Sequence, residues 1–159
     1  MLKTTKTARG FTLIEILVVI GIIAILAAVV LIAINPARQF AQANNSQRTS
    51  NVNAILNAIG QHIADNQGAM PGVLTAALCP SLTPCNITGV PGAANVDLCP
   101  SLVPLFIPSL PVDPTVTTGP VATCNVTYTT GYRASVDAAG RVTIAAPSAQ
   151  LGATVAVTR

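Results

Sequence analysis

Charge is scarce in this sequence of 159 residues, of which 8% are charged and 3% are aromatic. The formal net charge of +3 comes from Lys3, Lys6 and Arg9, because the remaining arginines balance the acids. Binding to phosphate backbones needs clustered Lys and Arg, and the chain is neutral beyond residue 10. Three Phe, two Tyr and no Trp are also too few for a surface that stacks bases. The composition therefore argues against nucleic acid as the main partner.

Motifs for catalysis and for cofactors are absent from the sequence as well. It contains no glycine-rich phosphate loop, no nucleophile elbow and no pair of histidine ligands. The one histidine, His62, lies far from the cysteines, and no Cys-x-x-Cys pair occurs, which argues against zinc. Asp97, Asp113 and Asp137 are far apart in sequence, which argues against calcium. We therefore expect no enzymatic activity, no cofactor and no metal.

A long apolar run lies near the N-terminus. Residues 16–34 carry no polar side chain and would span about 28 Å as a helix, enough to cross the hydrocarbon of a bilayer. The cations before the run place the N-terminus inside and the rest of the chain outside the membrane. A secretory signal peptide usually has an apolar core of about 7–15 residues that ends at a cleavage site of small residues. Here the run continues past Ala27 and Ala28, so a membrane anchor is the better interpretation.

The residues before this run resemble the class III leader junction of type IV pilins and related pseudopilins: Arg9-Gly10-Phe11-Thr12-Leu13-Ile14-Glu15. The resemblance implies that a prepilin peptidase removes the leader, residues 1–10, by cutting between Gly10 and Phe11, and that Phe11 is then N-methylated. It also implies that Glu15 pairs with the charged amine of Phe11, in its own chain or in a neighbour's, during subunit assembly. An unpaired carboxylate at the start of a membrane helix would cost several kcal/mol.

The same resemblance implies a structural subunit with defined partners and location. Such a subunit waits in the inner membrane, surrounded by lipid, and an assembly platform then adds it to a homo-oligomeric helical filament outside. A type IV pilus and a type II secretion pseudopilus remain alternatives. The proline-rich loop with its cysteines favours an exposed pilus surface, whereas the stretch Leu105–Pro114, with its Leu-Pro-Val-Asp-Pro, resembles pseudopilins and favours the second. A minor pilin that binds DNA or a surface is a third possibility.

A long helix is expected over residues 11–65, with a membrane part at 16–34 and an amphipathic part at 37–65. Pro36 predicts a kink or a local break next to Asn35, because proline lacks an N–H and disfavours helical geometry at the residue before it. Asn66-Gln67-Gly68 and Pro71 predict the end of the helix. The amphipathic part should lie on a sheet through one apolar stripe, which consists of Val52, Ile55, Leu56, Ile59 and Ile63.

Residues 66–120 read as a looping, proline-rich region, because ten prolines between Pro71 and Pro120 exclude long regular elements. Cysteines in this region and beyond it face the outer compartment, where disulfides persist. They are Cys79, Cys85, Cys99 and Cys124. Two bridges are expected, and three pairings are possible. We prefer the first cysteine with the second and the third with the fourth, because the close pair can form locally and the other would tie the loop to the sheet.

Residues 121–159 read as an antiparallel sheet of three or four strands. The expected strands are 132–137, 141–146 and 153–158, with 121–129 as an additional one. A hairpin turn at Ala138-Ala139-Gly140 joins two of them. The predicted fold is therefore α+β: a long N-terminal hydrophobic helix packed on a small antiparallel sheet.

Overall fold

The computed structural model describes residues 10–72 and 74–159, without the side chains of residues 32 and 33. The basic residues of the expected leader, among residues 1–9, lie outside this range. The chain forms two compact units, an N-terminal unit that ends at Ala37 and a head that comprises Arg38–Arg159.

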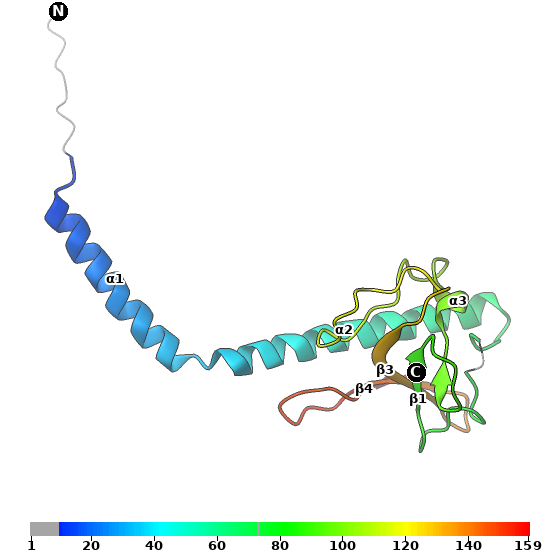
Figure 1. Ribbon diagram of the computed structural model, residues 1–159. Coiled ribbons are helices and arrows are strands. Elements are labelled where there is room, and N and C mark those ends of the chain that lie inside the picture. The colour runs from blue at the N-terminus through cyan, green and yellow to red at the C-terminus, as the bar shows by residue number, and fades with distance from the viewer. Residues whose placement is uncertain (1–9, 73) are drawn as a thin grey trace, which may run out of the picture. The chain divides into compact units, whose positions relative to one another are not determined.

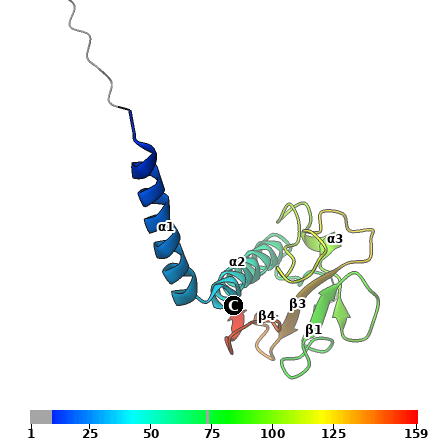
Figure 2. The same ribbon diagram turned by 60° about the vertical axis from the view of Figure 1, so that its left-hand side comes forward.

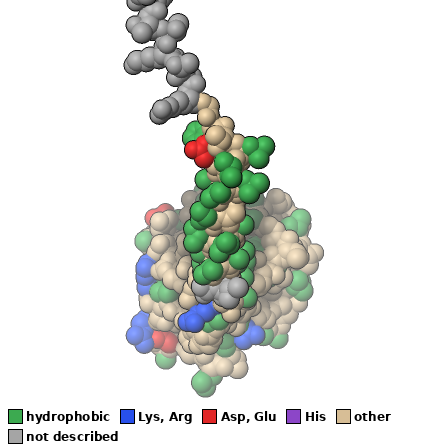
Figure 3. Space-filling view, turned by 90° about the vertical axis from the view of Figure 1, so that its left-hand side faces the viewer, with side chains coloured by type: hydrophobic (Ala, Val, Ile, Leu, Met, Phe, Trp, Pro, Cys, Tyr) green, Lys and Arg blue, Asp and Glu red, His purple; other side chains and the backbone are tan. Residues whose placement is uncertain are grey.

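The N-terminal unit contains one apolar helix, α1, which comprises Leu13–Ala33. Each large apolar side chain from Leu13 to Leu31 is at least 50% exposed. Figure 3 shows these side chains along the face of α1 that is toward the viewer. By length and composition, Leu13–Leu31 could cross a membrane. A helix that is apolar on all sides needs an apolar environment, which the described part of this unit does not itself supply.

The chain has two helices where one long helix was expected over residues 11–65. α1 ends at Ala33, and Ile34 adopts an extended conformation with φ −98° and ψ 119°. The second helix, α2, comprises Pro36–Asp65. Proline suits the first position of a helix, where its missing N–H is not needed, and it restricts Asn35 to non-helical geometry. The break predicted at Pro36 is therefore present.

The head contains a five-stranded sheet with the order β2-β1-β3-β4-β5, as Figures 1 and 2 show. Its strands are β1 (Cys85–Thr88), β2 (Asn95–Val96), β3 (Thr129–Val136), β4 (Val142–Ala146) and β5 (Val155–Thr158). β1 and β2 are parallel, and the other neighbouring pairs are antiparallel. A short helix, α3, comprises Cys99–Leu102. The last three expected strands correspond to β3, β4 and β5.

Two expectations about the sheet were wrong. The proline-rich region supplies β1 and β2, so the sheet has five strands and not three or four. These strands have only 4 and 2 residues and lie between prolines, which is why residue pattern gave no signal for them. Conversely, residues 121–128 form no strand beyond a single bridge between Val121 and Leu110. A disulfide draws Cys124 toward Cys99 in this segment.

The core lies between α2 and one face of the sheet. From the predicted stripe, Val52, Ile55, Leu56 and Ile59 are buried, and Ile63 packs partly buried against them. The opposite side of the core comes largely from the strands and the long loop, with Ile87, Leu110, Tyr132, Ala134 and Ile144 among its buried residues. The amphipathic pattern of α2 thus identifies the surface that packs on the sheet.

Two disulfides close the loops of the head. Cys79 is bonded to Cys85 and Cys99 to Cys124, with sequence separations of 6 and 25. These are the pairs that we preferred among the three possible pairings. Because all four cysteines are used in this way, none is free to bind zinc.

Candidate functional site

The junction between Gly10 and Phe11 lies in non-helical, exposed chain. α1 starts only at Leu13, and the side chain of Phe11 is 84% exposed. A side chain placed at Gly10 would meet nothing within 4 Å. Among the described residues, nothing therefore covers the peptide bond that the sequence predicts as the cleavage site.

Thr12 and Glu15 form a capping box at the start of α1. The carboxylate of Glu15 accepts hydrogen bonds from the backbone N–H of Thr12 at 2.9 Å and from its hydroxyl at 2.8 Å, both through Oε2. In return, the backbone N–H of Glu15 donates to the Thr12 hydroxyl at 3.3 Å. A carboxylate in the first turn also interacts favourably with the helix dipole. The hydrogen-bond donors that Thr12 offers to the Glu15 carboxylate are thus electrically neutral groups.

Thr12 is a residue that our sequence analysis missed. Its signal is the spacing Thr-x-x-Glu before an apolar run, which is the sequence pattern of a capping box. Within residues 10–37, Glu15 is the only charged side chain. The N-terminal unit therefore presents one acid and an exposed apolar helix, and the described part of it has no cation for that acid.

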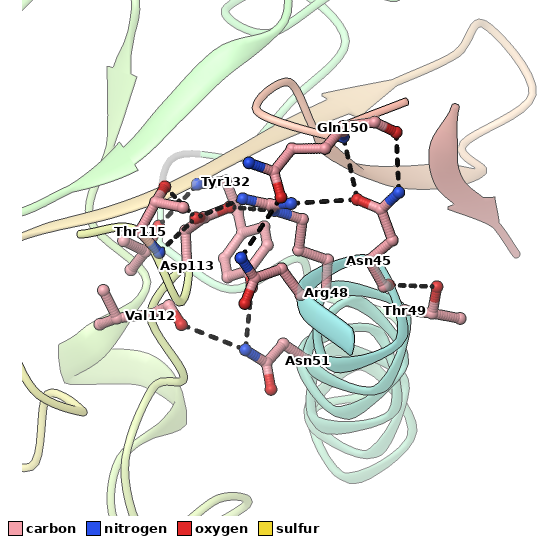
Figure 4. Close-up of polar contacts among 11 residues, drawn as sticks. Asn45, Arg48, Thr49, Asn51, Val112, Asp113, Thr115, Tyr132 and Gln150 are labelled. Atoms are coloured by element: carbon pink, nitrogen blue, oxygen red, sulfur yellow. Dashed lines mark hydrogen bonds and ion pairs between the residues drawn. The ribbon is translucent and has the colours of Figure 1, made fainter. Parts of the chain in front are cut away.

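A second polar cluster, here called the polar seam, joins α2 to the loops of the head (Figure 4). Its members are Asn45, Arg48, Asn51, Val112, Asp113, Thr115, Tyr132 and Gln150. At its centre, Arg48 donates from Nε to Asp113 at 2.7 Å and from a terminal nitrogen at 3.0 Å. Both side chains are 0% exposed. This is a bidentate, fully buried ion pair.

The hydrogen bonds of the seam determine the charge state of this pair. Burial alone would raise the pKa of Asp113, but hydrogen bonds from Arg48 and Thr115 outweigh it and hold this pKa below its ordinary value of 3.8. The hydrogen bond to Asp113 in turn raises the pKa of Arg48 despite burial. Both groups are therefore charged in the folded head at neutral pH.

The seam fastens α2 to two further segments of the head. Asn51 donates to the Val112 carbonyl at 3.1 Å and to the Tyr132 hydroxyl at 2.8 Å. Asn45 donates to the Gln150 carbonyl at 2.8 Å and accepts from the Gln150 N–H at 2.9 Å. The loop before β3 and the turn before β5 thus take their positions from α2.

Close backbone approach beside the ion pair requires glycine at Gly131 in β3. Its φ is +78°, and a Cβ there would lie 2.8 Å from the Cβ of Asp113. Sequence reasoning missed the partnership of Arg48 and Asp113. One signal was present, because Arg48 precedes Val52 by four residues and so continues the buried stripe of α2.

No metal site emerges among residues 10–72 and 74–159, in which no group of three His, Cys, Asp or Glu could hold an ion. Asp113 lies in its ion pair, Asp97 accepts a hydrogen bond from Tyr128, and Asp137 pairs with the exposed Arg141. His62 stacks edge-on against Phe106, with ring centroids 5.4 Å apart. These four side chains therefore contact different partners and do not form one cluster.

Comparison with known proteins identifies a family motif in the N-terminal segment. Residues 5–31 match the family model of the prokaryotic N-terminal methylation motif. No curated protein and no solved structure matches the chain. The matched residues include the exposed junction, the capping box and most of α1. This motif is a class III prepilin leader, which is typical of type IV pilins and pseudopilins. It supports the interpretation of the chain as a type IV pilin or pseudopilin precursor.

Proposed function

We propose that this chain is a structural subunit of a type IV pilus-like filament. A prepilin peptidase cuts it between Gly10 and Phe11 and methylates the new terminal amine, and an inner-membrane platform adds it to a homo-oligomeric helical filament. One observation carries this proposal: α1 follows the leader motif directly, and each large apolar side chain from Leu13 to Leu31 is exposed.

The exposed surface of α1 needs an apolar environment before and after assembly, and packing between helices, not removal from water, favours the exchange of lipid for neighbouring copies. Covering one large aliphatic side chain contributes about 1.5–3 kcal/mol relative to water. Lipid covers α1 before assembly, and the helices of neighbouring copies cover it afterwards. Contacts between unlike surfaces of identical subunits need not close into a ring, so they can extend a filament.

The disulfides of the head support a location outside the membrane. Disulfides persist in oxidising compartments and are rare in the cytosol. Both bridges lie in the head, beyond the apolar helix. With the N-terminal cations inside, this arrangement supports a single-pass precursor in the inner membrane.

Mass spectrometry of the mature chain tests the processing step. The expected N-terminus is Phe11 with a methylated amine, and the variant Gly10→Ile should remain uncut. Gly21→Ala is the matched control, because Gly21 also has open space around it but lies within α1. A mature chain that starts at Met1, or one cut beyond Ala28, would reject the proposal.

Two substitutions of Glu15 separate its possible roles. Glu15→Ala removes both the helix cap and the charge, whereas Glu15→Gln keeps a side chain that can complete the capping box. If the charge pairs with the amine of Phe11, both variants should be cut normally but should form no filaments. Normal filaments from Glu15→Gln would show that capping, and not charge, is what assembly requires.

A pseudopilin of a type II secretion system is the second candidate, favoured by the Leu-Pro-Val-Asp-Pro stretch at residues 110–114. Deletion of the chain separates the two functions. Loss of surface filaments with normal secretion indicates a pilin, and loss of secreted proteins indicates a pseudopilin. Immunogold labelling along the shaft, as opposed to the tip alone, would exclude a minor pilin that binds DNA or a surface.

A further inference from the structure

Three stretches of the sequence match the acceptor motif for N-linked glycosylation, Asn-x-Ser/Thr with x other than proline. They are Asn44-Asn45-Ser46, Asn86-Ile87-Thr88 and Asn125-Val126-Thr127. Because the motif specifies both groups, a transferase needs access to the amide of the asparagine and to the hydroxyl two residues later. A motif this short also occurs by chance, so the structure of the head decides which copy meets both conditions.

The first copy lies within α2, and a helix does not present it well. Residues two apart on a helix do not face the same side, so the amide of Asn44 and the hydroxyl of Ser46 point in different directions. Asn44 is also half-buried, and its amide nitrogen donates to the side chain of Gln150 at 3.3 Å. The helical backbone therefore argues against this copy.

The second copy lies in β1, where both of its groups are already engaged. The amide of Asn86 donates to Asn95 at 3.2 Å and accepts from Nε of Arg133 at 3.1 Å. The hydroxyl of Thr88 is buried and donates to the Tyr128 carbonyl. Transfer to this copy would require β1, which lies between β2 and β3 (Figure 2), to leave the sheet.

The third copy lies in an exposed, irregular segment before β3. Asn125, Val126 and Thr127 are all exposed. Within residues 10–72 and 74–159, no group forms a hydrogen bond with the side chain of Asn125 or of Thr127. The amide and the hydroxyl that the motif specifies are therefore both accessible in the folded head.

The residues on either side hold this segment in place. Cys124 precedes it and is bonded to Cys99. Tyr128 follows it and is buried, with its hydroxyl donating to Asp97 at 2.6 Å and its carbonyl accepting from the Gly89 N–H at 3.1 Å. The three residues of the motif are thus presented between two fixed points.

A cavity with a volume of about 420 Å³ lies beside the third copy. Its lining includes Val126 and the threonines 118, 123 and 127, and none of the described residues that line it is charged. A sugar ring has hydroxyls at its rim and C–H groups on its faces, so threonine hydroxyls and an apolar side chain suit its first units.

The surface around this motif lacks free charge. Residues 66–132 contain two charged residues, Asp97 and Asp113, and both accept hydrogen bonds within the head. The same segment exposes large apolar side chains, with Leu82 95% and Leu105 82% exposed. Attached sugars are bulky and solubilising. A glycan here would hydrate a surface that no charged side chain hydrates.

We propose that Asn125 is a site of N-linked glycosylation. The inference rests on the proposed function, which places the head outside the membrane and within reach of a membrane-bound transferase. The donor is an oligosaccharide linked to a lipid through pyrophosphate. In the transfer, the bond from the anomeric carbon to the pyrophosphate oxygen breaks, and the leaving pyrophosphate keeps the electron pair. Nδ2 of Asn125 forms the new bond to that carbon and gives one proton to a base of the transferase.

Mass spectrometry of the intact chain, purified from the cells that make it, tests the site. The mass should exceed that of methylated residues 11–159 with two disulfides by the mass of an oligosaccharide. Trypsin cannot separate Asn86 from Asn125, because no Lys or Arg lies between Arg48 and Arg133. Substitutions therefore identify the site.

Two sets of variants examine the two groups of the motif. Asn125→Gln should remove the excess mass completely, whereas Asn44→Gln and Asn86→Gln should retain it. Thr127→Ser keeps the hydroxyl and should retain the excess mass. Thr127→Val has a similar size without the hydroxyl and should lose it. Asn125 and Thr127 are exposed, so the head should stay folded in these variants.

The outcomes separate this inference from the proposed function. A wild-type chain that is cut, methylated and disulfide-bonded but carries no sugar would overturn the glycan alone. Excess mass that persists in Asn125→Gln, or that disappears in Asn44→Gln or Asn86→Gln, would overturn the assignment to Asn125. A chain with an uncut leader and free thiols would instead refute the proposed function.

Discussion

The substitution Asp113→Asn removes the negative charge from the buried ion pair without changing the size of the side chain much. Arg48 then stays buried with a full positive charge, because its side chain is 0% exposed and its two short bonds to the carboxylate are its charge-compensating contacts. Removing one partner of such a pair costs about 3–5 kcal/mol. With a typical urea slope of about 2 kcal/mol per molar, the unfolding midpoint should fall by roughly 1.5–2.5 M.

Tyrosine fluorescence of the full-length chain in detergent measures this change in the head alone. Tyr128 and Tyr132 are the two tyrosines of the sequence, both are buried in the head, and the chain has no Trp. Asp137→Asn is the matched control. It also breaks a pair with arginine, but the Arg141 side chain in that pair is 66% exposed. Solvent screens such pairs, so its midpoint should stay near that of the wild type. Equal midpoints for Asp113→Asn and the control would refute the role of the buried pair.

Three further predictions follow from the same contacts. The folded head holds the pKa of Asp113 below 3.8, so stability from the pair is present above about pH 4 and is lost as pH falls through the lowered pKa; the acid-unfolding curve of Asp113→Asn should lack this loss. Replacing Cys99 and Cys124 together by Ser should lower the free energy of unfolding by about 3.5 kcal/mol, measured in urea, since the bridge closes a sequence separation of 25. Thr12→Val should speed amide exchange at Glu15 about fivefold in detergent, whereas Thr12→Ser should keep the cap and the wild-type rate.

Local signals in the sequence were sufficient for α1, for the break before α2 and for the packing face of α2. Each depends on residues near one another in the chain. The apolar run defines α1, Pro36 defines the break, and the stripe from Val52 to Ile63 defines the buried face. Strands β3 to β5 were also detectable, because they alternate and have short turns between them.

Contacts between distant residues were not predictable from pattern. Arg48 and Asp113 are 65 positions apart, and nothing local to either residue indicates the other. β1 is short and lies beside prolines, and its place in the sheet comes from pairing with β3, more than 40 positions further along. The Thr12 cap is a different case. Its Thr-x-x-Glu spacing is a local signal for a capping box, which the interpretation of Glu15 as an assembly residue did not include.

Asp113 and Glu15 differ in how their charge is met. Asp113 has a buried cation, Arg48, in its own chain, so its charge is paired within the head. Among the residues that the structure describes, Glu15 has only the neutral donors of Thr12, and residues 10–37 contain no cation. Cleavage after Gly10 would create one at the amine of Phe11, four residues away. On the proposed function, the charge of Glu15 would gain its partner only after processing, so we expect head variants to affect stability and Glu15 variants to affect assembly.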